Sequence, residues 1–297
     1  MAPEKLDKAQ ILGRISKDDG GCRPEKIAKT MNIKMRNGKS WGMARFLEYY
    51  RDLTLVLLQK EFTVRYKNTA LGYVWSVLNP LLYAIIYLFV FKVIFKIQIQ
   101  NYLLFLVSGV FFWQAFSNSV CASSSAFIGN SSLIKKVQFS RECLVLSGVL
   151  NDLTHFILSI PIIVIIMVFY GMAPTLDWLW AVPFLLTVQL LLTFGIALMV
   201  ATGNLFLRDL ERLITFLVML WFYLTPIIYK EDMVPAALQW TKFVNPVAGI
   251  AINWRHLFMG EPLAPLLLGS AGVWSAAIFA LGYWIYKKSN WKFAEYV

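Results

Sequence analysis

Charged side chains are scarce in this sequence of 297 residues. Asp, Glu, Lys and Arg together make up 15% of the chain, whereas 58% of the residues are hydrophobic and the mean hydropathy is +0.60. A soluble domain usually has about a quarter of its residues charged. The length alone would allow one or two soluble domains. So apolar a chain cannot hide its hydrophobic residues in one core, and the bilayer is predicted to be its solvent.

Cysteine and histidine are also rare, which excludes several kinds of site. The three cysteines, Cys22, Cys121 and Cys143, are odd in number and scattered, so they predict free thiols rather than a disulfide framework. The two histidines are His155 and His256, they are predicted to lie on different sides of the membrane or nearly so, and a single histidine does not make a metal site. We therefore predict no catalytic residues and no metal ligands.

A nucleotide site is missing as well. Gly38-Lys39-Ser40 is similar to the end of a phosphate-binding loop, but Ile33 replaces the first glycine that such a loop needs. No other cofactor motif is found, so the chain is predicted to bind no cofactor itself. The first 67 residues hold 15 Lys or Arg and 8 Asp or Glu, and they lack the apolar run and cleavage site of a secretory signal.

What the sequence has instead is six long apolar stretches. Each is about 20 residues long, which is the length that a helix needs to cross a bilayer. The first, fourth and fifth of them are interrupted by Pro80, Pro183 and Pro226, and a proline kinks a membrane helix and frees a carbonyl. The predicted fold class is all-α integral membrane, with six transmembrane helices near residues 70–95, 103–126, 144–170, 179–205, 213–230 and 263–286.

Basic residues are distributed unevenly among the connections between these stretches. Of the Lys and Arg residues, 23 lie on one side of the predicted helices and 5 on the other. The positive-inside rule assigns the richer side to the cytoplasm. An even number of crossings then puts both termini in the cytoplasm. Topology therefore explains the formal charge of +11, and nucleic-acid binding is not needed to account for it.

The residues before the first stretch fall into two parts. Residues 1–40 are charged and carry no sustained apolar period, so they are predicted to form a mobile cytoplasmic tail. Residues 41–68 are predicted to form an amphipathic helix lying flat at the cytoplasmic surface, ahead of the six-helix transmembrane domain 69–297. That helix could lie in the membrane interface or pack on protein as a solvated helix. Its apolar side chains recur at helical spacing and are Phe46, Tyr50, Leu53, Leu57 and Val64.

The connection 231–262 is long for a hairpin between membrane helices. It holds two apolar pieces separated by Asn245-Pro246, and each piece is too short to span a bilayer. Such pieces are typical of re-entrant or interfacial helices. We therefore predict short re-entrant periplasmic helices before the last crossing, with an ordinary capping loop as the alternative.

The second apolar stretch carries an unusual polar stripe. Gln114, Asn118, Cys121 and Ser125 step by four, three and four residues, so they share one helix face. Polar stripes in lipid usually join helices, but they can also line a wet pathway. Aromatic rings in the first two stretches could stack on sugars or fill ordinary lipid-facing positions. The possible channel lining comprises Tyr83, Tyr87, Phe112, Trp113, Gln114, Phe116, Asn118 and Ser125.

One acid is predicted inside a membrane helix. Asp152 shares a helix face with His155, which would suit a proton relay. It lies near the cytoplasmic end, however, where it can pair with Arg141 or cap a neighbouring helix, and we favour that structural role. An ion-coupled secondary carrier would need several such acids and an internal repeat, and neither is found.

Four passages together resemble a known family. They are KEFTVRYKNTALGYVWSVLNPLL at 60–82, FSNSVCASSSAFIGNSSLIKKVQFSRE at 116–142, RDL at 208–210 with YLTPIIY at 223–229, and Asn-Pro at 245–246 with Arg255 and Gly260. In this order and spacing they resemble the permease subunits of ABC exporters for O-antigen, capsule and teichoic-acid polymers. The resemblance covers residues 45–297. Ser140 stands where that family often has proline, and residues 1–40 have no counterpart in it.

The resemblance implies a homodimer of six-helix permeases in the bacterial inner membrane, above two copies of a separate ABC ATPase subunit. ATP and Mg²⁺ would bind to that partner, so this chain is predicted to be a transport subunit and not an enzyme. The implied substrate is a polysaccharide linked to a polyprenyl diphosphate lipid, as in O-antigen export and lipopolysaccharide biosynthesis. An ABC permease that exports drugs or small lipids is the alternative.

The resemblance also implies roles for residues. Segment 131–142 would be the coupling helix that docks into the ATPase, the helix in 41–68 would be the interface helix, and 231–262 would form the periplasmic gate. Basic residues at the cytoplasmic entrance could meet the lipid diphosphate, although the positive-inside bias already accounts for them. The coupling residues would be Leu133, Ile134, Lys135, Lys136, Val137, Phe139, Arg141 and Glu142, and the lipid-diphosphate entrance would be Arg51, Arg65 and Lys67.

Overall fold

The fold is given by a computed structural model, which describes residues 43–66, 74–96, 98–136 and 139–293. Within these ranges every regular element is a helix and no strand occurs. The prediction of an all-α protein is confirmed. The predicted tail 1–40, Lys67 and Val137 lie outside the described residues.

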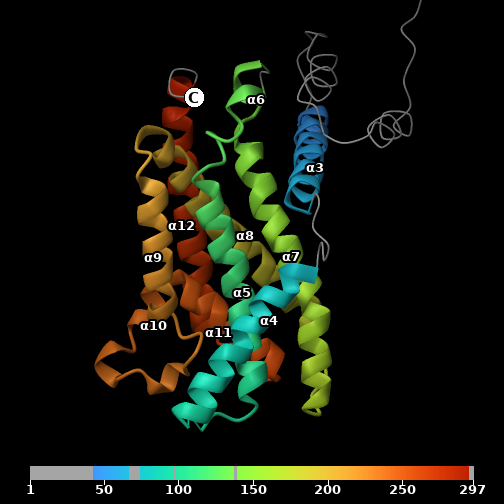
Figure 1. Ribbon diagram of the computed structural model, residues 1–297, viewed down its shortest axis with the longest axis vertical. Coiled ribbons are helices and arrows are strands. Elements are labelled where there is room, and N and C mark those ends of the chain that lie inside the picture. The colour runs from blue at the N-terminus through green and yellow to red at the C-terminus, as the bar shows by residue number, and fades with distance from the viewer. Residues whose placement is uncertain (1–42, 67–73, 97, 137–138, 294–297) are drawn as a thin grey trace, which may run out of the picture.

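Five helical segments are long and apolar enough to cross a membrane. They lie side by side as a bundle along the long axis of the molecule (Figure 1). The first combines α4 (Val74–Tyr87) with the π-helix that continues it (Leu88–Ile94), and the others are α5 (Tyr102–Ser123), α7 (Glu142–Phe169), α8 (Trp178–Phe206) and α12 (Pro265–Ser289). Five of the six predicted crossings are therefore present as spans.

The remaining predicted crossing, 213–230, is only partly helical. Its helix α9 (Leu210–Leu224) has 15 residues, fewer than the roughly 20 that a span requires. The helix ends because Thr225 takes an extended conformation, with φ −103° and ψ 133°. A residue that precedes a proline, as Thr225 precedes Pro226, is disfavoured in the helical region. The interruption predicted at Pro226 is therefore present, and a sixth helix long enough to span is not found among the described residues.

Helix α5 forms the centre of the bundle. It packs against α4, α7, α8, α9 and the short helix α11 (Pro246–Met259). Most of its side chains are buried, including Phe105, Phe112 and Phe116. Because so many helices cover α5, only a narrow strip of its surface is exposed.

Helices α8 and α12 approach each other at two glycines. A Cβ atom on Gly282 would lie 2.2 Å from the carbonyl oxygen of Gly195, and one on Gly195 would lie 2.7 Å from the backbone of Phe279. Small residues allow membrane helices to pack backbone against backbone in this way. The glycine pair thus fixes the last helix against α8.

The two ends of the bundle carry different elements (Figure 1). What we name the α6 end holds α3 (Met43–Tyr66), α6 (Ser131–Lys136), the C-terminal part of α12 and the turn η4 (Asn290–Lys292). A separate hydrophobic cluster, which includes Leu53, Leu57 and Phe293, packs at this end. The opposite, α11 end holds α11 with η2 (Glu231–Met233), η3 (Ala236–Leu238) and α10 (Thr241–Val244).

Candidate functional site

Helix α11 is a short helix inserted among the longer ones. It packs against α5, α8 and α12, and most of its side chains are buried. The side-chain oxygen of Asn245 caps it by accepting a hydrogen bond from the backbone N–H of Val247 at 3.1 Å. Pro246 takes the first helical position, where no N–H is needed. A short helix after Asn245-Pro246 is therefore confirmed, whereas its relation to the membrane stays a prediction.

A buried arginine of α11 forms hydrogen bonds with the non-helical stretch that follows α9. Pro226 interrupts the helix, so nearby carbonyls lack helical partners and must be satisfied in another way. The Nη2 atom of Arg255 donates to the carbonyls of Pro226 and Ile227, the latter at 3.1 Å. The guanidinium carbon lies 3.8 Å from the ring centroid of Phe105 on α5, and Arg255 is only 2% exposed. One side chain thus joins α11, α5 and the non-helical stretch.

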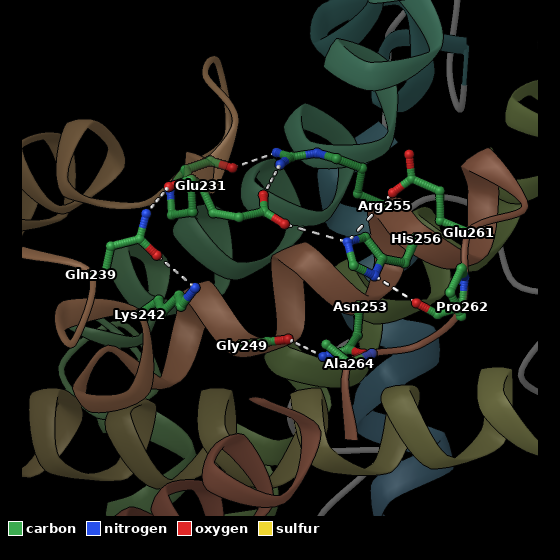
Figure 2. Close-up of polar contacts among 11 residues, drawn as sticks. Glu231, Gln239, Lys242, Gly249, Asn253, Arg255, His256, Glu261, Pro262 and Ala264 are labelled. Carbon is green, nitrogen blue, oxygen red and sulfur yellow. Dashed lines mark hydrogen bonds and ion pairs between the residues drawn. The ribbon is translucent and has the colours of Figure 1, made fainter. Parts of the chain in front are cut away.

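Carboxylates balance the charge of Arg255 at the α11 end (Figure 2). A Glu231 oxygen lies 3.7 Å from Nη1 of Arg255, and Nε2 of His256 lies 3.4 Å from Glu231 and 3.5 Å from Glu261. The other ring nitrogen, Nδ1, lies 2.8 Å from the carbonyl oxygen of Pro262. Both nitrogens face atoms that only accept hydrogen bonds. A doubly protonated, positively charged imidazole satisfies this arrangement.

The directions of the pKa shifts agree with that charge state. Burial raises the pKa of Glu231, but its hydrogen bond with His256 and the charge of Arg255 outweigh burial, and the pKa lies well below its ordinary value. Burial lowers the pKa of His256, but contacts with Glu231 and Pro262 outweigh it and raise the pKa. We call Glu231, Arg255, His256 and Glu261 the α11 ion network, in which two cations balance two carboxylates.

The predicted coupling residues of α6 divide into two groups. Leu133 and Ile134 are buried in the hydrophobic cluster of the α6 end. Lys135 and Lys136 are exposed, and Phe139 is half-buried against the same cluster. Among the coupling residues that the structure describes, Lys135 and Lys136 are therefore the fully exposed ones.

The charged residues at the far end of the coupling segment make contacts within the chain. Arg141 donates from Nη1 to the carbonyl oxygen of Asn290 at 3.0 Å. The carboxylate of Glu142 accepts hydrogen bonds from the hydroxyls of Tyr50 and Tyr286. The two pairs of charges are thus not equivalent, because one pair is exposed and the other is bound to α3 and α12.

The predicted channel residues of α5 separate by polarity. The aromatic residues Phe112, Trp113 and Phe116 are buried inside the protomer. Asn118 and Ser125 are exposed, and the half-buried Gln114 donates from Nε2 to Asn118 at 3.4 Å. We call Gln114, Asn118, Cys121 and Ser125 the polar stripe, of which the first three lie on α5 and Ser125 lies in the turn after it.

The remaining predicted positions lie at the edges of the bundle. On α4, exposed Tyr83 stacks on Tyr87, with ring centroids 6.5 Å apart. Arg51, predicted for the lipid-diphosphate entrance, is exposed and pairs with Asp52 at 3.1 Å. The side chain of Arg65 lies outside the described residues, like Lys67. The entrance therefore stays a prediction.

The predicted intramembrane acid joins two helices. Asp152 is buried on α7, and its carboxylate accepts a hydrogen bond from the hydroxyl of Ser119 on α5 at 3.0 Å. A second buried bond runs from the indole nitrogen of Trp254 on α11 to Gln189 on α8, at 3.1 Å. Both contacts tie helices together, which supports the structural role for Asp152.

Comparison with known proteins identifies the family. The family model for "ABC-2 type transporter" matches residues 52–253, more than half of the chain. This chain belongs to the ABC-2 type transporter family. It is 41% identical over 265 residues to an O-antigen export system permease protein RfbA of Klebsiella pneumoniae and 42% identical over 249 residues to a second one from that organism. Another permease of that name, from Myxococcus xanthus, is 30% identical over 260 residues.

These matches cover most of each protein. They include 89%, 84% and 85% of this chain and 99%, 96% and 98% of the three relatives, in the same order. In this ABC-2 transporter chain the family match spans the coupling segment and the polar stripe, and it ends at Asn253. Sequence reasoning named Arg255 only as part of a family pattern and missed its contacts. A signal was present, because Arg255 is a single charge in a largely apolar run that follows a proline break.

Proposed function

We propose that this chain is the membrane-spanning permease subunit of an ATP-driven exporter. It moves a polyprenyl-diphosphate-linked, O-antigen-like polysaccharide from the cytoplasm across the bacterial inner membrane. The observation that carries the proposal is the identity of 41% and 42% to O-antigen export permeases along 99% and 96% of their lengths. The bundle of apolar helices supplies the membrane body that such a permease needs.

In the proposed topology, α9 and the non-helical stretch 225–229 together form the remaining crossing. The 15 helical residues and the stretch after them reach the length of about 20 residues that a crossing needs. Non-helical backbone is tolerated at membrane depth where protein covers it, and Arg255 provides that cover. The distribution of basic residues, 23 against 5, puts both termini and the α6 end in the cytoplasm. The helix α3 is then the interface helix.

A homodimer with a channel between its protomers is supported by the polar stripe. The helix α5 is mostly buried, its exposed strip carries Asn118, and exposed Ser125 follows in the turn after it. Polar side chains that face lipid are costly unless they find polar partners. We infer that a second copy and a wet channel cover this strip. Exposed Tyr83 on the neighbouring α4 offers a ring face on which a sugar can stack.

Energy would come from two copies of an ABC ATPase, which hold the ATP and Mg²⁺. Lys135 and Lys136 are the exposed charges that α6 offers to this partner. The buried side chains of Leu133 and Ile134 hold α6 in place for docking. At the other end of the bundle, residues 231–262 would form the periplasmic gate, with α11 as a re-entrant helix fixed by the α11 ion network.

The proposal is tested in cells that make lipid-linked polymer but lack their own export permease. The chain is produced with its ATPase partner, and polymer on intact cells is measured by antibody labelling. Surface polymer should appear with the active ATPase and be absent with an ATPase variant that cannot hydrolyse ATP. Polymer that stays inside cells containing both subunits would contradict the proposal. Efflux of a fluorescent apolar dye without polymer export would support the drug or lipid alternative.

A further inference from the structure

One face of α3 lies along the coupling segment. Tyr50, Leu53, Leu57 and Lys60 are spaced by three, four and three residues, so they share a helix face. The two leucines are 4% and 1% exposed and belong to the hydrophobic cluster that also contains the apolar residues of α6. The apolar middle of this face is therefore packed at the α6 end, and its two ends are polar.

Tyr50 and Lys60, the polar residues at the ends of this α3 face, contact the two ends of segment 131–142. The Nζ of Lys60 donates to the side-chain oxygen of Asn130, directly before the segment begins. The hydroxyl of Tyr50 donates to Oε1 of Glu142 at 2.8 Å and accepts a hydrogen bond from Ser140 at 2.7 Å, both at the segment's end. Ten residues of helix separate Tyr50 from Lys60, a distance of about 15 Å along the axis. Helix α3 thus braces the segment from end to end.

Helix α12 also forms hydrogen bonds with Glu142. The hydroxyl of Tyr286 on α12 donates to Oε2 of Glu142 and accepts a hydrogen bond from the backbone N–H of Glu142 at 3.2 Å. Beside it, the guanidinium of Arg141 donates to the carbonyl of Asn290 and lies 5.7 Å from the ring centroid of Phe293. Residues 141 and 142 are therefore tied to the end of α12.

The two oxygens of one carboxylate are thus taken by two different helices. Burial raises the pKa of the Tyr50 phenol above its ordinary value, and the neighbouring Glu142 raises it further. Its hydroxyl therefore stays protonated and donates. Hydrogen bonds to a charged acceptor are about twice as strong as neutral ones. We call Glu142, Tyr50 and Tyr286 the Glu142 clamp. Its charge-assisted hydrogen bonds resist changes in the distances between Glu142 and the two helices, so the clamp can transmit movement.

We propose that Glu142 is a positioning residue for energy coupling, which with Tyr50 and Tyr286 passes movement of segment 131–142 to α3 and α12 together. The inference rests on the proposed function, because it needs an ATPase that moves the segment. Without this clamp, α3 would keep its apolar packing and the contact of Lys60 with Asn130, and α12 would keep the contact of Arg141 with Asn290, but no single group would join the two helices to the segment. Glu142 then acts inside the permease, and Lys135 and Lys136 act at the docking surface.

The test uses the complete permease–ATPase complex and variants that remove only a hydroxyl. Tyr50→Phe and Tyr286→Phe keep their rings, including the stack of Tyr286 on Phe127. Each should lower the polymer exported per ATP hydrolysed by about tenfold, the effect of losing one charge-assisted hydrogen bond. Permease abundance, co-purification with the ATPase and ATP hydrolysis should not change. Tyr283→Phe is the matched control, since Tyr283 lies on the same helix and its hydroxyl has no hydrogen bond within the described part of the chain.

Further variants separate the clamp from docking. Glu142→Gln should lower polymer per ATP, and adding Tyr50→Phe to it should bring little further loss, because both changes act on one carboxylate. The pair Lys135→Glu and Lys136→Glu should instead lower co-purification with the ATPase. Equal polymer per ATP for Tyr50→Phe, Tyr286→Phe and the Tyr283→Phe control would overturn the inference.

Two other outcomes would also overturn it. Loss of ATPase co-purification in the phenylalanine variants would make Glu142 a docking residue. A wild-type complex that hydrolyses ATP and exports no polymer would contradict the proposed function itself, and this result is visible before any variant is compared.

Discussion

The guanidinium of Arg255 lies over the ring of Phe105, 3.8 Å from its centroid, and so connects α11 to α5. The same guanidinium donates to the carbonyls that the break at Pro226 leaves without helical partners. A cation over an aromatic ring contributes about 2 kcal/mol or more where water is excluded. One side chain therefore contacts three parts of the chain at the α11 end.

Arg255→Ala should destabilise the protein by about 3 kcal/mol or more, because it leaves buried carbonyls and Glu231 without their partner. Arg255→Lys should be intermediate, since an ammonium keeps the charge but not the planar group that stacks and reaches two carbonyls. Thermal unfolding of the purified chain in detergent measures both effects. Lys242→Ala, which removes a cation near Phe243 at the same end, is the control and should be close to wild type. Wild-type unfolding temperatures for both Arg255 variants would contradict this.

The α11 ion network should make stability depend on pH. The pKa of His256 is raised above its ordinary value of 6.5, so its contribution is complete below pH 6.5 and is lost as pH rises through the raised pKa. The pKa of Glu231 is lowered below its ordinary value of 4.5, so its contribution is complete above pH 4.5 and is lost as pH falls through the lowered pKa. Both contributions are therefore complete between pH 4.5 and 6.5.

We expect the stability of wild type relative to His256→Gln to be greatest in that window and to decline at higher pH. Unfolding temperatures of the two proteins, measured across pH, give the difference. The second histidine, His155, is present in both proteins and cancels. A difference that stays constant from acidic to alkaline pH would show that His256 does not titrate in this network.

Gly282→Ala should separate the last helix from α8. A Cβ atom there would lie 2.2 Å from the carbonyl oxygen of Gly195, and backbone atoms can move apart only by disturbing the whole crossing. Overpacking of this kind costs about 1–3 kcal/mol or more. Gly272→Ala lies on the same helix with no atom within 4 Å of the new carbon, so it should be tolerated. Equal unfolding temperatures for the two variants would mean that α8 and α12 do not meet at these glycines.

The sequence predicted the long apolar helices well. It was less informative where a single residue ends a helix or makes a contact with a distant part of the chain. The apolar run 213–230 indicated a crossing with a kink at Pro226, but hydropathy alone did not show that the helix would stop there. The helix ends at Thr225 because Pro226 follows it. No sequence pattern indicated the contact between Lys60 on α3 and Asn130, which lies 70 residues further along the chain.

Side-chain direction in the candidate site was harder to predict. The sequence singled out Arg141 and Glu142 as charges for docking, but their partners Tyr50 and Tyr286 lie on helices remote in the chain. No local spacing reveals such a contact. The polar stripe was predicted as a face of one helix, and Gln114, Asn118 and Cys121 do lie on α5, whereas Ser125 lies in the turn after its end at Ser123.

The last prediction concerns what the polar stripe faces. If it lines a wet channel, Asn118→Cys should react with a charged, membrane-impermeant thiol reagent faster than Ile157→Cys by about an order of magnitude, since the reactive thiolate forms only in water. Ile157 is the matched control, because it is 42% exposed on α7 within an apolar surface. Both cysteines are placed in a chain that carries Cys121→Ser, which removes the native thiol of the stripe. Labelling is measured on the assembled complex in vesicles and normalised to labelling after unfolding. If Asn118→Cys stays unlabelled and instead forms a disulfide between two copies, the stripe is a dry seam between protomers, and the polymer must pass elsewhere.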